Sequence, residues 1–456
     1  MIDFLEEVNK RKEDILSDIQ TLCRIPSVLD EATAKDGQPF GKACREALDA
    51  MLQIGERDGY VYEDVDGYAG HIDIGEGDET LGILGHLDVV PCNDTGWNTD
   101  PYDMTIKDGK LYGRGVADDK GPLIAGYYAA KIINELNLPV KKKIRVIFGC
   151  NEENGSACMK YYFTKKPFPQ LGFTPDAGFP VVYGEKAGAH FHITGKVAKD
   201  NIIGLYSGTR PNVVPEVCEA YITGHYKQYK DSFIQYVNDH GLRGSVEEEG
   251  NHTKLVLIGK SAHASTPEEG INAATYMCHY LAMISQNQLV HFVNDCFYND
   301  HFGDKLGIAY KGLMGPLTVN LGVLNYKDEN VDMIIDMRVP HEVTEKMLTN
   351  PVDQHLEKYG LTQEHHLGKA LYIDPESALV KALHNSYVEF TGDYENKPQC
   401  IGGGTYAKSM PNCVAFGAEF PGTDNKMHQN NEEIAIDDLL KATAIYTKAI
   451  YDLIKK

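Results

Sequence analysis

Leu81–Pro91, with the sequence LGILGHLDVVP, places one histidine and one aspartate inside an apolar run. Apolar residues on both sides of a polar pair are typical of a strand buried on both faces, as in a parallel sheet. His86 and Asp88 then fall at the carboxyl end of this strand, where open α/β sheets place their sites. Because strand side chains alternate, we expect Asp88 to accept one imidazole N–H while the other nitrogen of His86 holds a metal. An isolated His-x-Asp is usually only a strand-end histidine, so this prediction depends on carboxylates further along the chain.

The composition is that of an ordinary globular protein with an acidic balance. The chain has 456 residues, of which 42% are hydrophobic, and its net charge is −22 with a pI near 5.2. This charge argues against nucleic acid or an anionic membrane as partner. The N-terminus lacks a basic n-region and an apolar h-region, and no window is apolar enough to span a membrane, so we expect a cytoplasmic protein. Ten scattered cysteines without Cys-x-x-Cys pairs indicate reduced thiols rather than disulfides or a cysteine zinc site.

Helices and strands are expected to alternate along the first 185 residues. Apolar spacing predicts helices over 3–23, 41–58, 123–136, 377–390 and 435–454, and strands over 70–75, 81–90, 143–149 and 413–417. This order predicts an α/β fold with a mostly parallel sheet flanked by helices.

From about Lys186 the pattern changes to alternating strands, and 190–196 and 254–260 share an Ile-x-Gly-Lys or Leu-Ile-Gly-Lys ending. This similarity predicts an inserted α+β domain of two related halves. The resulting division is a main domain in two segments, 1–186 and 373–456, interrupted by an insertion at 187–372.

Five residues at expected strand or loop ends have the chemistry of metal ligands. They are His86, Asp118, Glu153, Asp176 and His428. Two imidazoles and three carboxylates suit a pair of divalent ions with one carboxylate bridging them. Zn²⁺ is the expected metal, although these ligand types also accept Mn²⁺ or Co²⁺.

Five motifs, in one order, carry a resemblance to a known family. They are GHLD at 85–88, GRGVADDKG at 113–121, NEENG at 151–155, PDA at 175–177 and MHQNNE at 427–432. The set resembles that of the M20 family of metallopeptidases, most closely the PepV-type Xaa-His (carnosine-like) dipeptidases of bacteria. The resemblance implies a zinc-peptidase-like catalytic domain, 1–186 with 373–456, and a lid domain at 187–372.

Roles for individual residues follow from this resemblance. It implies that His86 and Asp176 hold one ion, that Glu153 and His428 hold the other, and that Asp118 bridges them. A cis peptide is implied between Asp118 and Asp119. The adjacent Glu152 would act as general base on a water whose acidity the two metals raise, and Asp88 would orient His86.

Residues for substrate binding are also implied by the resemblance. His263, in Ser261-Ala262-His263, matches a lid histidine that serves as oxyanion partner, and dimeric relatives receive it from a second subunit. Because the insertion is long, we expect one chain to supply His263 to its own site and to act as a monomer. Asn212 and Arg338 match lid positions for the substrate's terminal carboxylate, which arginine can bind bidentately. The remaining substrate-binding candidates are Gly404, Thr405 and Asp119.

The expected activity is hydrolysis of dipeptides or other short unblocked peptides, including Xaa-His. Two alternatives stay open: an N-acyl amino acid deacylase or carboxypeptidase of the same family, and a catalytically silent binding relative. A Gly-x-Ser-x-Gly elbow and a His-Glu-x-x-His helix are both missing from the sequence, which argues against a serine hydrolase and a mononuclear zincin.

Overall fold

The computed structural model describes residues 2–93 and 95–455. They divide into two compact units. The first comprises Met1–Gly184, Tyr372–Gln399 and Gly404–Lys456, and the second comprises Glu185–Leu371 and Cys400–Gly403. The second unit thus begins and ends beside the predicted bounds of 187 and 372, and it also takes in a short segment near residue 400.

A nine-stranded mixed sheet runs through the first unit. Its order is β1-β2-β6-β3-β7-β22-β9-β20, with β21 beside β9. The bounds are β1 Val61–Val65, β2 Ala69–Ile74, β3 Glu79–His86, β6 Lys142–Gly149, β7 Leu171–Thr174, β9 Val182–Glu185, β20 Leu371–Tyr372, β21 Gln399–Ile401 and β22 Cys413–Ala415. Small sheets add β4 Thr105–Lys107, β5 Lys110–Tyr112 and β24 Glu433–Ala435, and β8 Ala177–Gly178 with β23 Ala418–Glu419.

The α/β fold class is confirmed, and the sheet is mixed, with parallel pairing among its central strands. Strands β6, β3, β7 and β22 are parallel neighbours, whereas β1, β2 and β9 pair antiparallel. The prediction of a mostly parallel sheet is therefore wrong at the edge formed by β1 and β2. There, β1 and β2 are joined by a tight turn through Asp66 and Gly67, both with positive φ, and a turn this short permits only an antiparallel hairpin.

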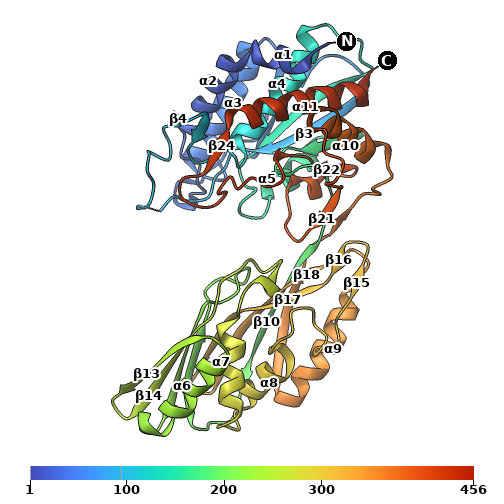
Figure 1. Cartoon of the computed structure of the whole chain (residues 1–456). Coiled ribbons are helices and arrows are strands. Elements are labelled where there is room, and N and C mark those ends of the chain that lie inside the picture. Colours follow the sequence, from blue (N-terminus) through green and yellow to red (C-terminus); the bar gives the residue numbers. More distant parts are fainter. Residues whose placement is uncertain (1, 94, 456) are drawn as a thin grey trace. The chain divides into compact units, whose positions relative to one another are not determined.

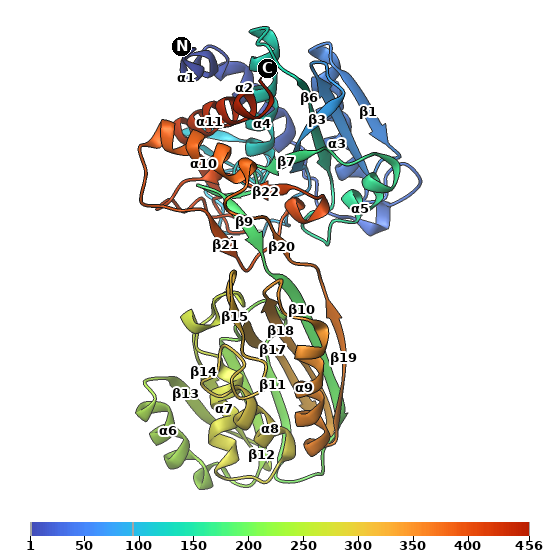
Figure 2. The same cartoon turned by 90° about the vertical axis from the view of Figure 1, so that its right-hand side faces the viewer.

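Helices cover both faces of this sheet. They are α1 Phe4–Asn9, α2 Lys12–Cys23, α3 Lys42–Arg57, α4 Lys120–Glu135, α5 Ala157–Lys165, α10 Ala378–Thr391 and α11 Ile436–Ile454. Figures 1 and 2 show α4 and α11 side by side against the sheet. The single helix predicted over 3–23 is two helices, and α4 starts three residues before the predicted 123, because Pro122 is tolerated in a first turn. Among the described residues, no helix combines the length and apolar character that a membrane crossing requires.

The second unit is built on one eight-stranded antiparallel sheet, ordered β13-β14-β12-β11-β17-β18-β10-β19. Its strands are β10 Ala187–Lys196, β11 Ile202–Ser207, β12 Val217–Thr223, β13 Arg243–Glu249, β14 His252–Ile258, β17 Thr318–Lys327, β18 Asn330–Val339 and β19 Leu361–Leu367, and a separate hairpin pairs β15 Lys311–Gly312 with β16 Gly315–Pro316. Helices α6 Lys230–Asp239, α7 Ala273–Ala282, α8 Gln288–Phe297 and α9 Glu345–Tyr359 lie on one face (Figure 2).

Burial along β10 explains this one-sided packing. Ala187, Ala189, Phe191 and Ile193 are buried, and the residues between them are at least partly exposed, as expected for a strand with one face on the core. The eight strands form one continuous sheet with no division into two parts. The predicted relation between two halves of the insertion therefore stays a prediction.

Lys120, the first residue of α4, ties the start of this helix to the end of α2. Its side chain is fully buried, and Nζ donates to the carbonyl oxygens of Leu22 at 3.0 Å and Ile25 at 2.8 Å. Burial lowers the pKa of the Lys120 ammonium. The ammonium adds a second donor to each carbonyl, which also accepts a backbone N–H from Ile25 or Ser27, and so holds the chain that leaves α2.

Replacing Lys120 with methionine is expected to destabilise the fold. The variant keeps the length of the side chain but loses both hydrogen bonds of the ammonium, while the carbonyls of Leu22 and Ile25 keep only their backbone donors, Ile25 and Ser27. Loss of these charged hydrogen bonds is expected to cost about 1–3 kcal/mol in the free energy of unfolding. Urea denaturation followed by circular dichroism measures this. Lys107→Met, on exposed β4, is the control, and equal unfolding midpoints for the two variants would contradict the assigned role.

Candidate metal centre

The five predicted ligands come together where the central strands end. His86 is the last residue of β3, Glu153 lies in the turn after β6, and Asp176 follows β7. Because β6, β3 and β7 are parallel neighbours, their carboxyl ends meet at one edge of the sheet. Asp118, just before α4, and His428, in the loop before β24, complete the group.

Asp118 joins two sets of ligand atoms. Its Oδ1 lies 2.9 Å from His86 Nε2, and its Oδ2 lies 2.8 Å from His428 Nε2. Asp176 Oδ2 is 3.7 Å from His86 Nε2, while Glu153 Oε1 is 3.0 Å from His428 Nε2. Each set of three, His86–Asp118–Asp176 and Asp118–Glu153–His428, has its ligand atoms within 4.8 Å of one another. The two sets are those that the family resemblance implies.

The charges of these groups suit bound cations. Burial raises the pKa of Asp176 well above its usual value, and the nearby carboxylates of Asp119 and Asp118 raise it further. Burial also opposes ionisation of Asp118, but hydrogen bonds from His428 and His86 hold its pKa well below the ordinary range. Clustered buried carboxylates of this kind are stabilised by divalent ions, and the imidazole and carboxylate donors fit Zn²⁺, Mn²⁺ or Co²⁺.

Asp88 supports the centre through different atoms from those predicted. Its main-chain carbonyl, not its carboxylate, accepts the Nδ1–H of His86 at 2.9 Å. The Asp88 carboxylate lies 3.6 Å from Nδ1 and instead accepts the backbone N–H groups of Glu152 at 3.0 Å and Glu153 at 3.1 Å. The prediction was wrong because β3 ends at His86, so strand alternation does not extend to residue 88. Donation from Nδ1 nevertheless orients the ring, so that Nε2 is the nitrogen that would bind an ion beside Asp118.

Glu152 lies on the same turn as Glu153 and is partly buried beside the cluster. Burial raises the pKa of Glu152 to about 8, and the carboxylates of Glu153 and Asp88 contribute to the shift. Its backbone N–H is held by Asp88, so the turn that carries both glutamates is anchored to the end of β3.

The cis peptide between Asp118 and Asp119, implied by the family resemblance, is present. Asp119, predicted to bind substrate, has no exposed surface, and its Oδ2 accepts the backbone N–H of His86 at 3.0 Å. A side chain this deeply buried does not reach a substrate. We therefore correct its assignment to holding the end of β3.

The other substrate-binding candidates of the first unit are Gly404, which is exposed, and Thr405. The hydroxyl of Thr405 accepts the backbone N–H of Ala407 at 3.1 Å, as the N-cap of a short 3-10 helix, Tyr406–Ser409. Tyr406 was missed by sequence analysis: its ring lies edge-on to His86, with centroids 6.1 Å apart. An aromatic residue after a glycine run carries no sequence signal for such a contact.

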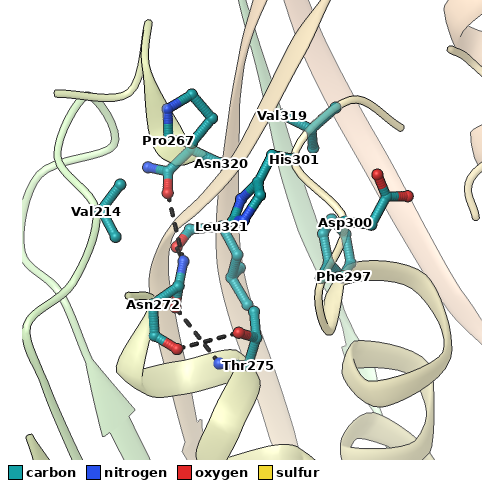
Figure 3. A pocket seen from close by; sticks show the side chains of 10 residues that line it. All are labelled: Val214, Pro267, Asn272, Thr275, Phe297, Asp300, His301, Val319, Asn320 and Leu321. Carbon is teal, nitrogen blue, oxygen red and sulfur yellow. Dashed lines mark hydrogen bonds between the residues drawn. The ribbon is translucent and has the colours of Figure 1, made fainter. Parts of the chain in front are cut away.

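In the second unit, Asn212 and His263 lie on paired loops. The carbonyl of Asn212 accepts the N–H of Ala264 at 3.0 Å. Asn320 donates to the carbonyls of Pro211 and Val213, both at 3.0 Å, and so fixes the two residues that flank Asn212. Figure 3 shows Asn272 beside Asn320 in the pocket behind this loop, where Asn272 Nδ2 donates to Asn320 Oδ1 at 3.3 Å.

His263 and Arg338 are held by neighbours within the same unit. The Nδ1 of His263 accepts the backbone N–H of Ser265 at 3.2 Å, which places the proton of the neutral ring on Nε2. Arg338 donates from Nε and Nη2 to the buried carboxylate of Asp336, at 2.8 and 3.1 Å, and from Nη1 to Gly402. Asp336, two residues earlier on β18, was not singled out from the sequence.

Buried carboxylates at the ends of parallel strands, paired with two histidines, define an α/β protein of the metal-dependent hydrolase class. Residues 82–452 match the family model described as peptidase family M20/M25/M40. The chain belongs to this family of metallopeptidases.

Named relatives agree with this assignment. "Putative dipeptidase YtjP" of Bacillus subtilis (strain 168) is 37% identical over 468 residues, which cover 98% of this chain and 99% of the relative. Human carnosine dipeptidase 1 shares the fold with a TM-score of 0.60 at 16% identity, over 99% of this chain and 98% of that one. The M20 metallo-carboxypeptidase Sso-CP2 of Sulfolobus solfataricus has a TM-score of 0.59 at 19% identity, over 96% and 98% of the two chains.

Asp88→Asn is expected to lower kcat/KM for peptide hydrolysis by about 10- to 100-fold, the usual effect of losing a group that supports metal ligands. Asparagine has one acceptor oxygen and an NH₂ group, so it cannot hold the N–H groups of both Glu152 and Glu153. Steady-state kinetics measure the loss. Asp78→Asn, at an exposed position before β3, is the control, and equal kcat/KM for the two variants would show that the Asp88 carboxylate is dispensable.

Proposed function

We propose that this chain is a dipeptidase that uses two divalent ions and acts on short peptides with free termini. The observation that carries the proposal is the sharing of Asp118: each of its oxygens faces a separate histidine, and each histidine has a second carboxylate beside it. Ions bound at these two groups would lower the pKa of a bound water and polarise the peptide carbonyl.

Glu152 is the proposed general base. It would take the proton from the attacking water and return it to the nitrogen of the leaving amine, so that one water molecule is consumed for each peptide bond broken. Support comes from its place on the turn that also carries Glu153 and from the anchoring of that turn by Asp88. Because Glu152 precedes the candidate ligand Glu153 directly, its carboxylate would be available to a water bound beside that ligand.

Preference for dipeptides is supported by the printed name of the Bacillus relative and by the fold shared with carnosine dipeptidase 1. Xaa-His is one proposed substrate type. Asn212, His263 and Arg338 are the proposed contacts of the second unit, with His263 donating from Nε2 to the oxyanion and Arg338 binding the terminal carboxylate. The carboxypeptidase among the similar folds makes longer substrates the main alternative.

Zn²⁺ is the proposed metal, and a functional monomer in the cytoplasm is the proposed state. All ten cysteines are free thiols, which suits a reducing compartment. The acidic composition supports a small peptide, rather than nucleic acid or a membrane surface, as the partner.

A substrate series tests the proposed function. We expect hydrolysis of a dipeptide such as β-alanyl-histidine or leucyl-histidine, with kcat/KM at least about 10-fold higher than for its N-acetylated form or for a tripeptide, because a lost terminal contact costs about one charged hydrogen bond. Product formation is measured by chromatography on metal-loaded enzyme. Preference for the acetylated compound would instead indicate a deacylase, and preference for longer peptides a carboxypeptidase.

Glu152→Gln is expected to lower kcat by about 100-fold or more, the usual contribution of a general base, while bound metal stays at the wild-type level. Kinetics and elemental analysis of the same sample separate the two effects. Glu56→Gln, on the exposed surface of α3, is the control. Full turnover by Glu152→Gln would remove Glu152 from the mechanism.

A further inference from the structure

Glu432 is a buried carboxylate that holds the loop carrying Asp118. Its side chain has no exposed surface. Oε1 accepts three backbone N–H groups, those of Gly115 at 3.1 Å, Ala117 at 2.9 Å and Asp118 at 3.1 Å. Oε2 accepts from Nη1 of Arg114 at 2.7 Å. The Glu432 side chain therefore holds the backbone of the segment that leads into Asp118, although the two segments are more than 300 residues apart in sequence.

The same segment carries the second histidine. His428 lies four residues before Glu432, and between them the side-chain amides of Asn430 and Asn431 donate to the carbonyls of Thr95 at 3.0 Å and Gly96 at 2.9 Å. The chain between His428 and Glu432 is therefore anchored along its length. A shift of Glu432 would move Asp118 relative to His428.

The pairing of Glu432 with Arg114 is hard to explain by stability alone. Arg114 is buried and lies over the ring of Trp97, 5.3 Å from its centroid. Among the described residues its Nε has no hydrogen-bond partner. A buried ion pair contributes little more to stability than apolar residues of similar volume. The Glu432 carboxylate contributes mainly to the geometry of the loop, because it accepts several N–H groups at fixed positions.

We infer that Glu432 is a positioning residue that sets the orientation of Asp118 between the two proposed cation sites. By holding the backbone N–H of Asp118, Glu432 fixes the backbone position from which Oδ1 reaches His86 and Oδ2 reaches His428. This inference rests on the proposed two-metal function. It predicts that Glu432 controls metal affinity without touching either ion.

Two variants and a matched control test this inference. Glu432→Gln keeps the size of the side chain but loses the charge, and Glu432→Asp keeps the charge but is too short to reach all three N–H groups. The control is Glu433→Gln, one residue later, whose carboxylate pairs with Lys110 and Lys426 away from the Asp118 loop. Metal affinity is measured by competition between the folded protein and a chelator, with Co²⁺ absorption spectra as a report on ligand geometry.

The expected result is two ions per wild-type chain and a loss of affinity of about 10-fold in Glu432→Gln and up to about 100-fold in Glu432→Asp, with an altered Co²⁺ spectrum. Glu433→Gln should match wild type. If Glu432→Gln does not fold, the double variant Glu432→Gln with Arg114→Met removes the unpaired charge, and it should show the same loss of affinity.

Wild-type affinity and an unchanged spectrum in folded Glu432 variants would overturn the inference and leave only a structural role, even where the unfolding midpoint falls. Failure of the proposed function looks different: wild type itself would bind fewer than two ions, or would bind two ions and hydrolyse no dipeptide. The second of these outcomes leaves the metal-affinity test of Glu432 intact.

Discussion

The candidate metal centre of the first unit depends on the carboxylate of Asp118, which both sets of candidate ligands share. Each of its oxygens faces a different histidine, and each histidine has its own second carboxylate. Such crowding of buried acidic groups is unfavourable unless positive charge lies among them. The imidazole and carboxylate donors fit metal ions, which agrees with membership in a family of metallopeptidases.

The surrounding structure holds Asp118 and its partners from several directions. Parallel strands bring His86, Glu153 and Asp176 to one edge, since their chain directions agree. Asp88 anchors the glutamate turn, and Lys120 fastens the helix that follows the shared aspartate. These supports are mostly side chain to backbone contacts, so they fix loops that have no regular structure of their own.

Sequence analysis predicted that the five candidate ligands lie together, and they do. Three of them, His86, Glu153 and Asp176, come at or after the ends of strands with a clear apolar pattern, whereas Asp118 and His428 were singled out through the family motifs. Sequence analysis failed where a contact depends on atoms rather than on residue types. The role of Asp88 is one case: the end of β3 decides whether its carbonyl or its carboxylate meets His86. Asp119 is another, since sequence motifs do not distinguish a buried carboxylate that binds backbone N–H groups from one that meets substrate. For the same reason Glu432, the last residue of the motif at 427–432, was not singled out. The antiparallel edge of β1 and β2 was also missed, because apolar strands look alike whichever direction they run.

An anomalous difference map, recorded at the absorption edge of the metal on crystals of fully active enzyme, tests the central claim most directly. The account predicts two peaks flanking Asp118, one between His86 and Asp176 and the other between Glu153 and His428. A single peak, or active crystals with no peak at these residues, would contradict it.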